Sequence, residues 1–144
     1  DNDLKTNEFG INGILDIKMK NAEMVGVKIA YNKTLNDLTK FYEKIDYLRL
    51  CEAIGIVMDN AIEAAMDLDE KIVYVDIDTD KGFHMKVINK FLNAVDIDKM
   101  FINNYSTKKR SSGLGLNYLY GLKSKGIYTK INIVDDTFIV SIDV

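Results

Sequence analysis

The 144-residue sequence contains no proline, only one cysteine and only one histidine. Without a second cysteine, Cys51 cannot form an internal disulfide, which is typical of proteins in a reducing compartment. These counts also exclude a zinc site built from cysteine and histidine alone. Because proline-rich linkers, internal repeats and low-complexity stretches are all missing, there is no sign of a domain boundary. We therefore expect one domain spanning residues 1–144.

The sequence also lacks an excess of basic residues and any long apolar run. Its formal net charge is -3, which argues against a general nucleic-acid binder. The longest apolar run, Ala53–Met58, is far shorter than a membrane-spanning helix. Hydrophobic residues make up 47% of the chain, enough for a core without disulfide or metal support. No signal peptide is visible, and we interpret the start as a cut inside a longer protein.

Apolar residues recur at helical spacing in three places. Residues 47–67 form the clearest pattern, with an apolar face opposite a charged one, as in an amphipathic helix. Residues 8–24 show the same spacing and are followed by Gly26, a plausible helix end. A shorter helix is predicted near 116–125, where Gly126 would end it.

The strands predicted from the sequence are short and mostly arranged in hairpins. Turn residues separate the members of two pairs, as expected for antiparallel neighbours. Helices interleaved with such strands indicate an α+β two-layer sandwich. The predicted strands are residues 27–31, 71–78, 83–89, 129–134 and 138–144.

A basic, serine-rich loop precedes two glycines and the last predicted helix. Main-chain N–H groups at a helix start attract anions, and Gly113 and Gly115 let the backbone approach a ligand closely. The combination is typical of a phosphate-binding loop, although a surface loop with glycine turns and solvated lysines has the same composition. The residues that add charge and hydroxyl donors are Ser106, Thr107, Lys108, Lys109, Arg110, Ser111 and Ser112.

Asn60 lies at the border between the polar and apolar faces of the helix predicted over residues 47–67. An amide in this place is partly shielded, and its carbonyl oxygen is a suitable ligand for Mg²⁺. Asp59 and Glu63 are close enough along the helix to hold water molecules of the ion. The alternative is a capping or surface asparagine.

Two other groups of residues are interpreted as structural. Asp76, Asp78 and Asp80 imitate the start of a calcium-binding loop, but Val87 stands where that loop needs a glutamate. A strand that runs into a turn accounts for these aspartates. His84 lies on a predicted strand, and we interpret it as structural rather than catalytic.

The order of the motifs resembles the GHKL ATPase superfamily, and more narrowly the Agr-type, peptide-quorum-sensing branch of sensor histidine kinases. LCEAIGIVMDNAIEAA, residues 50–65, resembles the N-box, and VINKF, residues 87–91, resembles the divergent G1 region of that branch. STKKRSSGLGL, residues 106–116, resembles the ATP lid and G2 box. GINGILDIKMKNAEMVGVKI, residues 10–29, is similar to the helix and strand that open the domain.

This resemblance implies a Bergerat-type α/β sandwich, with a mixed, mainly antiparallel sheet covered by helices on one face. ATP and Mg²⁺ would bind between the N-box helix and the lid. Asn60 would be the Mg²⁺ ligand, Asn60 and Lys108 would serve catalysis, and Asn89 would lie nearest to the residue that recognises adenine. The implied ATP-binding residues are Asn60, Glu63, Asn89, Ser106, Thr107, Lys108, Arg110, Gly113, Leu114, Gly115 and Leu116.

Three positions depart from the family pattern. Ile56, one turn before Asn60, replaces a residue that is polar in many histidine kinases, so no base is visible there. Ser112 stands where the lid arginine is expected, and Arg110 is its substitute. Arg49 and Glu52 exchange the charges of a family acid–base pair, which still predicts an i,i+3 ion pair.

The resemblance implies a catalytic domain that transfers the γ-phosphoryl group of ATP to a histidine outside this chain. The expected partners are the dimerisation helices of the same full-length kinase, which carry that histidine, and a downstream response regulator; no nucleic acid is expected. The full-length kinase would be a homodimeric, membrane-anchored bacterial sensor with this domain in the cytoplasm. The isolated domain need not be dimeric.

Three alternatives remain open from the sequence. The first is another GHKL class, either an ATPase or an anti-sigma serine kinase. The second is a degenerate nucleotide-binding interaction module, because Ile56 and Ser112 depart from the kinase pattern. The third is an α+β domain without a ligand.

Overall fold

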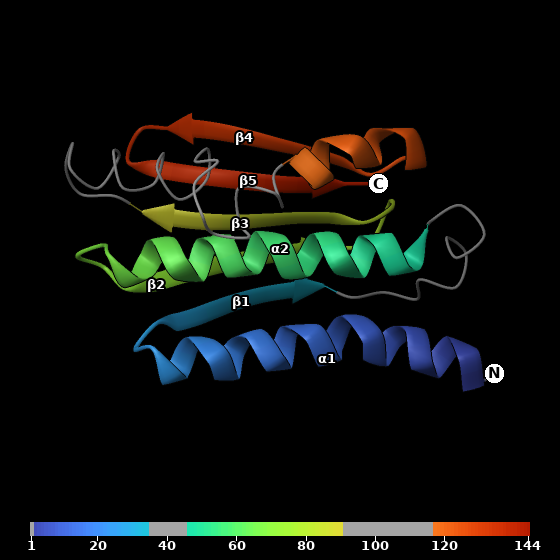
Figure 1. Cartoon of the computed structure of the whole chain (residues 1–144), viewed down its shortest axis with the longest axis horizontal. Coiled ribbons are helices and arrows are strands. Elements are labelled where there is room, and N and C mark those ends of the chain that lie inside the picture. Colours follow the sequence, from blue (N-terminus) through green and yellow to red (C-terminus); the bar gives the residue numbers. More distant parts are fainter. Residues whose placement is uncertain (1, 35–45, 91–116) are drawn as a thin grey trace.

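The computed structural model describes residues 2–34, 46–90 and 117–144, which form a two-layer sandwich (Figure 1). One layer is a five-stranded sheet with the order β1-β2-β3-β5-β4, and the other consists of helices. This arrangement confirms the predicted fold class. The elements are α1 (Asn2–Met24), β1 (Lys28–Thr34), α2 (Tyr47–Met66), β2 (Ile72–Asp78), β3 (His84–Lys90), η2 (Leu122–Lys125), β4 (Tyr128–Val134) and β5 (Thr137–Asp143).

The sheet is mixed and mainly antiparallel, as predicted. β1 and β2 run parallel, with α2 between them in the sequence, while the pairs β2–β3, β3–β5 and β5–β4 are antiparallel. Both predicted hairpins are confirmed. Gly82, before β3, has a φ of 119°, and Asp135, between β4 and β5, has a φ of 54°. Glycine and aspartate are residue types that tolerate such turn conformations.

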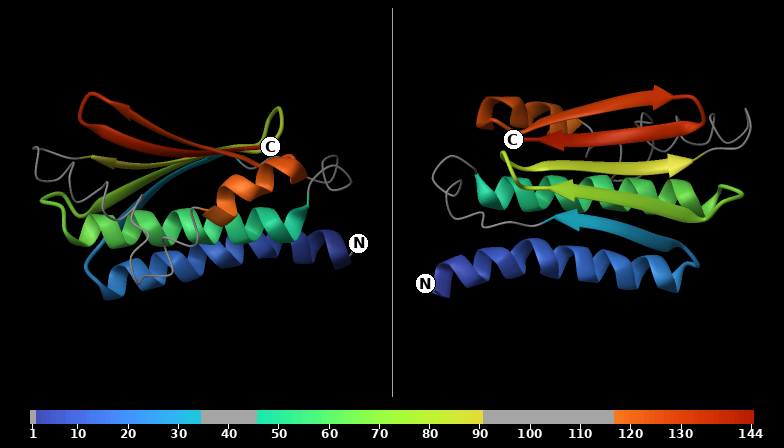
Figure 2. Two further views of the ribbon diagram at one scale, coloured as in Figure 1. Left: turned by 45° about the horizontal axis from the view of Figure 1, so that its top comes forward. Right: turned by 180° about the vertical axis from the view of Figure 1, so that it is seen from behind.

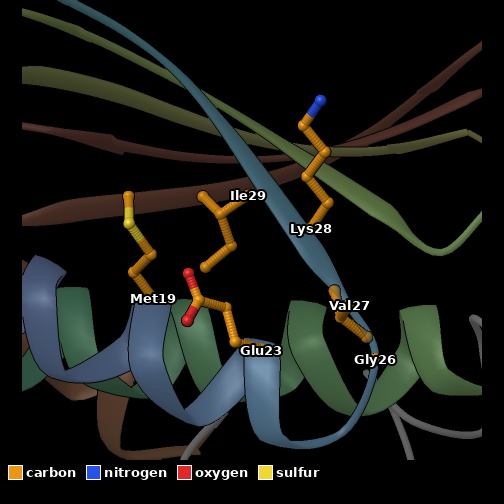
Figure 3. A pocket seen from close by; sticks show the side chains of 6 residues that line it. All are labelled: Met19, Glu23, Gly26, Val27, Lys28 and Ile29. Atoms are coloured by element: carbon orange, nitrogen blue, oxygen red, sulfur yellow. The ribbon is translucent and has the colours of Figure 1, made fainter.

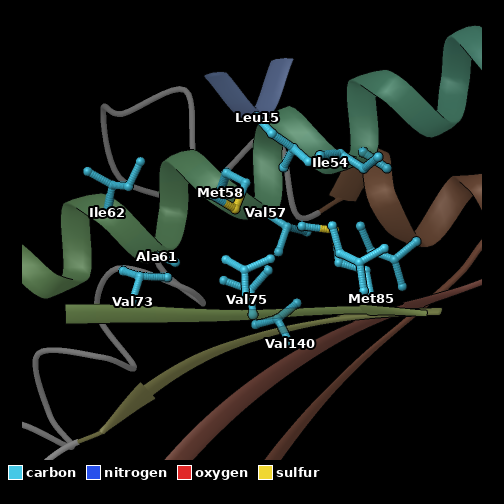
Figure 4. Close-up of a cluster of buried hydrophobic side chains, with 14 of the residues drawn as sticks. Leu15, Ile54, Val57, Met58, Ala61, Ile62, Val73, Val75, Met85 and Val140 are labelled. Atoms are coloured by element: carbon cyan, nitrogen blue, oxygen red, sulfur yellow. The ribbon is translucent and has the colours of Figure 1, made fainter. Parts of the chain in front are cut away.

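Both long helices lie on the same face of the sheet, side by side (Figure 2). The predicted apolar face of α2 is buried against the sheet, because alternate residues of the central strands point toward it. Figure 4 shows the resulting contact of aliphatic side chains from both layers. The residues of this core include Leu50, Ile54, Val57, Met58, Ala61 and Ala65 from α2, and Val73, Val75, Ile77, Met85, Val87, Phe138, Val140 and Ile142 from the sheet.

Most element boundaries lie within one residue of the sequence prediction, and three elements differ more in length or type. α1 begins at Asn2 rather than at residue 8. β1 continues to Thr34, beyond the predicted residue 31, because its whole length pairs with β2. The last predicted helix is a helical segment, residues 117–125, in which residues 117–121 are α-helical and the 3-10 helix η2 follows. Gly126, with a φ of 78°, ends this segment as predicted. Within the described ranges, neither helix has the length and apolar character needed to cross a bilayer.

The start of α2 is fixed by Asp46, whose Oδ1 accepts the main-chain N–H of Arg49 at 3.2 Å. We expect Asp46→Ala to lower the free energy of unfolding by about 1 kcal/mol, because this N–H loses its acceptor. Asp46→Asn keeps an acceptor oxygen and should lose much less. Urea unfolding of both variants tests the cap. An equal loss in both would assign the effect to the charge of Asp46, which lies 3.9 Å from Lys125.

Candidate functional site

Asn60 is a buried amide in the middle of α2. Only 5% of its surface is exposed, and Ala61 and Ala64 beside it are buried as well. It is therefore neither a cap nor a surface residue, which removes the alternative left open by the sequence. Its side-chain amide carries one acceptor oxygen and one NH₂ donor group, so this position can serve as a ligand for a bound group.

Asn89 brings a second buried amide to the same place. It lies on the helix-facing side of β3 with 2% of its surface exposed. Its Nδ2 donates to the main-chain oxygen of Ala61 at 3.1 Å, and Ala61 directly follows Asn60 in α2. Asn89, predicted from a separate motif, therefore lies beside the residue that directly follows Asn60, where β3 contacts α2. The other polar atom of its side chain, Oδ1, is a hydrogen-bond acceptor.

The two carboxylates near Asn60 are in different environments. Glu63 follows Asn60 by three residues, which places both on one side of the helix, and it is partly buried. Asp59 is rotated by about 100° from Asn60. Its Oδ1 forms a 2.8 Å ion pair with Nζ of Lys18 in α1. Asp59 thus has an ion-pair partner in α1, while its predicted role beside Asn60 stays a prediction.

Ile56 is partly buried and packs against the hydrophobic core. It precedes Asn60 by one helical turn, so this turn presents a hydrocarbon side chain where a catalytic base would be sought. The structure therefore agrees with the departure noted in the sequence.

The first half of α2 carries a polar contact that the sequence did not predict. Arg49 and Glu52 form the predicted ion pair, with 2.6 Å between the guanidinium and Oε1 of Glu52. The same oxygen accepts the hydroxyl of Tyr118, from the helical segment 117–125, at 3.1 Å. Burial and the nearby Glu52 carboxylate raise the pKa of Tyr118, so its hydroxyl stays protonated and remains a donor. Local patterning could not reveal a contact between residues so distant in the sequence.

The predicted phosphate-binding residues lie outside the described residues, within the range 91–116. The residues on either side of this range are described, and both contact α2. Asn89 precedes the range and contacts Ala61, while Tyr118 follows it and contacts Glu52. The predicted site residues in this range are Ser106, Thr107, Lys108, Arg110, Gly113, Leu114, Gly115 and Leu116.

His84 lies on the face of the sheet that the helices do not cover. It is five positions from Asn89 along β3, so the two side chains point to opposite faces. Its Nδ1 is 2.7 Å from Oδ1 of Asp143, its cross-strand neighbour on β5. Asp76 and Asp78 lie on the same open face, and Asp78 accepts the main-chain N–H of Asp80 in the following turn. Strand and turn geometry therefore account for these residues, as the sequence analysis proposed.

A separate hollow of about 400 Å³ opens where α1 is connected to β1. Figure 3 shows Met19 and Glu23 rising from α1 toward Ile29 of β1. Gly26, Val27 and Lys28 complete its lining, which includes none of the predicted site residues.

A model of the GHKL domain family matches residues 45–144, which include α2, β3 and the hydrogen bond between Asn89 and Ala61. The chain belongs to the GHKL family. No curated protein matches this GHKL domain.

The GHKL domain is similar in fold to three histidine kinases of known structure. The catalytic domain of ThkA superposes with a TM-score of 0.64 at 14% identity, over 95% of this chain and 90% of that domain. AdeS of Acinetobacter baumannii gives 0.57 at 15% identity, over 99% of this chain and 75% of the other. Full-length ShkA in complex with AMPPNP gives 0.59 at 15% identity, over 93% of this chain but 29% of ShkA. At these identities the likeness establishes the fold of a histidine kinase catalytic domain.

Proposed function

We propose that this GHKL domain binds ATP with Mg²⁺ and transfers the γ-phosphoryl group to a histidine on a dimerisation helix outside the chain. The observation that carries this proposal is the pair of buried amides, Asn60 and Asn89, at the contact of α2 with β3. The fold of histidine kinase catalytic domains supports it, and so does ShkA, which was crystallised with the ATP analogue AMPPNP.

Asn60 fits the role of a Mg²⁺ ligand. Mg²⁺ prefers oxygen ligands, takes only one or two from the protein and keeps several water molecules. The Asn60 amide supplies one such oxygen from a position in α2 that is only 5% exposed. Glu63, on the same side of α2, would hold a water molecule of the ion. When bound, Mg²⁺ would neutralise phosphate charge during transfer.

Asn89 fits recognition of the adenine ring. Its Nδ2 is already engaged with Ala61, so its orientation is fixed, and Oδ1 is the atom left to accept a hydrogen bond. The exocyclic amino group of adenine is a suitable donor. Asn89 would thus replace the aspartate that most GHKL domains carry in this region.

The phosphates would be held by residues of the range 91–116. The main-chain N–H groups of Gly113–Leu116 would donate to phosphate oxygens, because glycines let the backbone approach an anion closely. Lys108 and Arg110 would offset the charge that develops during transfer, while Ser106 and Thr107 would add hydroxyl donors.

Phosphoryl transfer by such a site depends on positioning rather than on a strong base. The acceptor histidine is neutral near pH 7 and already has a free lone pair, which would attack the γ-phosphorus while the bond to the ADP oxygen breaks. A hydrocarbon residue at position 56 is compatible with this chemistry. It would be less compatible with a serine acceptor, whose hydroxyl proton has to be removed.

In its cellular setting we propose an Agr-type sensor kinase of a peptide quorum-sensing system. The combination of DNAIEA at residues 59–64 with STK and GLGL in the lid region supports this assignment. The full-length kinase would be a membrane-anchored homodimer with this domain on the cytoplasmic side, and it would pass the phosphoryl group to a response regulator.

The test is a calorimetric titration of the chain with AMPPNP, with and without Mg²⁺, followed by ATP and separately supplied acceptor proteins. Mg²⁺-dependent binding and phosphorylation of a dimerisation helix would support the proposal. Binding with phosphorylation of a serine substrate instead would assign the anti-sigma class. Binding without any transfer would favour an interaction module, to which Ile56 points, and the absence of binding would refute nucleotide recognition.

His84 provides a check on the location of the acceptor. We expect His84→Gln to leave AMPPNP affinity and transfer to an added dimerisation helix unchanged, because His84 lies on the opposite face of the sheet from Asn89. The lost surface pair with Asp143 should change the free energy of unfolding by less than about 1 kcal/mol. Loss of transfer in a folded variant would overturn the assignment of His84 as structural.

A further inference from the structure

Tyr118 attaches the chain that follows the glycine loop to the same helix that carries Asn60. Only Asn117 separates Tyr118 from Leu116, the last residue of the proposed phosphate-binding sequence. The hydroxyl of Tyr118 donates to Oε1 of Glu52 at 3.1 Å, and the guanidinium of Arg49 donates to the same oxygen at 2.6 Å. We call these three residues the Tyr118 anchor.

The Tyr118 anchor and Asn89 contact different stretches of α2, at Glu52 and at Ala61. Glu52 and Ala61 are nine residues apart, which is about 13 Å along the axis of α2. The described part of the chain stops at Lys90, one residue after Asn89, and resumes at Asn117, one residue before Tyr118. α2 therefore sets the separation of the two ends of the range that carries the proposed phosphate ligands.

We propose that Glu52 and Tyr118 are positioning residues for nucleotide binding, which hold the chain that directly follows Gly113–Leu116 at a set place on α2. This inference rests on the proposed function. Glu52 is suited to the task because one carboxylate accepts from both Arg49 and Tyr118. A lysine or arginine at position 52 could only donate hydrogen bonds, so it could not accept one from the Tyr118 hydroxyl.

The anchor is not what keeps the helical segment 117–125 folded onto the domain. Leu119 and Leu122 are 1% and 3% exposed and attach the segment to the core by hydrophobic contact. The Arg49–Glu52 pair, in contrast, lies at the surface, where ion pairs contribute little to stability. Removing the Tyr118 hydroxyl should therefore leave the fold intact and loosen only the first turn after the glycine loop.

When a substitution lowers the population of the binding-competent arrangement, the apparent dissociation constant rises by the same factor. The free energy of one such hydrogen bond corresponds to about a three- to tenfold change in population. We therefore expect the dissociation constant of Mg·AMPPNP to rise by about three- to tenfold in Tyr118→Phe and in Glu52→Ala. The double variant should be no weaker than Glu52→Ala, because both changes break one contact. Glu52→Gln keeps an acceptor oxygen and should bind nearly as well as the unsubstituted chain.

The matched control is Tyr120→Phe, because Tyr120 is in the same segment and is 45% exposed. It should leave the affinity unchanged. Thermal midpoints of all variants should agree, and Tyr118→Phe should speed hydrogen exchange of the amides of residues 117–121 even without nucleotide. Unchanged affinity and exchange in Tyr118→Phe would overturn the positioning role. Failure of the unsubstituted chain to bind AMPPNP would refute the proposed function, while the exchange measurement would still decide whether Tyr118 holds this turn.

Discussion

Asn60→Ala is expected to abolish Mg²⁺-dependent nucleotide binding in a domain that remains fully folded. The proposed ligand oxygen is removed, and we expect the affinity for Mg·AMPPNP to fall by at least about a hundredfold. The free energy of unfolding should change by less than about 1 kcal/mol, because the packing lost with the side chain is offset by removal of a buried polar group and by the higher helix propensity of alanine. A large loss of binding without loss of stability would mark Asn60 as a functional residue rather than a core residue.

Calorimetry with and without Mg²⁺, combined with urea unfolding, measures both quantities. Asn132→Ala is the matched control, because it removes an exposed amide from β4, the edge strand of the sheet. Its nucleotide affinity should equal that of the unsubstituted chain. If Asn60→Ala binds Mg·AMPPNP as tightly as the control, Asn60 is not the metal ligand.

Among the substitutions proposed for this domain, Asn89→Asp is expected to lower the free energy of unfolding the most, and this loss should depend on pH. At neutral pH the introduced carboxylate cannot donate to the Ala61 oxygen and would be buried beside it, which should cost about 3 kcal/mol. Burial favours the protonated form, so the pKa of the introduced carboxyl should be higher in the folded than in the unfolded state. Stability then decreases as the pH rises above the unfolded pKa. Below about pH 4 the protonated carboxyl can donate to Ala61, and much of the loss should disappear.

Urea unfolding at neutral and at acid pH, each compared with the unsubstituted chain, tests this expectation. Asn132→Asp makes the same chemical change at an exposed position and should differ from the unsubstituted chain by less than about 0.5 kcal/mol at either pH. Equal stability of Asn89→Asp and Asn132→Asp at neutral pH would show that the Asn89 contact with Ala61 does not hold β3 against α2.

The elements that follow from local periodicity could be predicted from the sequence. The apolar face of α2 is buried as its spacing indicated, and the two hairpins form at the turns marked by Gly82 and Asp135. The opposite orientation of His84 and Asn89 follows from strand alternation alone. The position of Asn60 at the border of the helix faces predicts a partly shielded amide. In the structure this amide is almost completely buried.

The contacts that join distant parts of the chain could not be predicted in this way. Asn89 meets Ala61 because β3 packs on α2, and no local pattern encodes that packing. Tyr118 meets Glu52 because the helical segment 117–125 lies against the first half of α2. Asp59 likewise pairs with Lys18 of α1, a contact between helices that the local pattern around Asn60 does not indicate. Side-chain pairing across elements depends on tertiary geometry, whereas periodicity reports only which face of an element is buried.

The parallel pairing of β1 with β2 has a consequence for the order in which this domain folds. Lys28 of β1 pairs with Ile72 of β2 although the whole of α2 lies between them in the sequence. Each hairpin, in contrast, pairs strands that directly follow one another in the chain. Hairpins form within microseconds, but pairings that close long loops are slow because chain entropy is lost before the contact is gained. We infer that β1 joins the sheet late, after the β2–β3 hairpin has met α2, the helix that carries Asn60. A nucleotide held there would favour the finished domain over every partly assembled one.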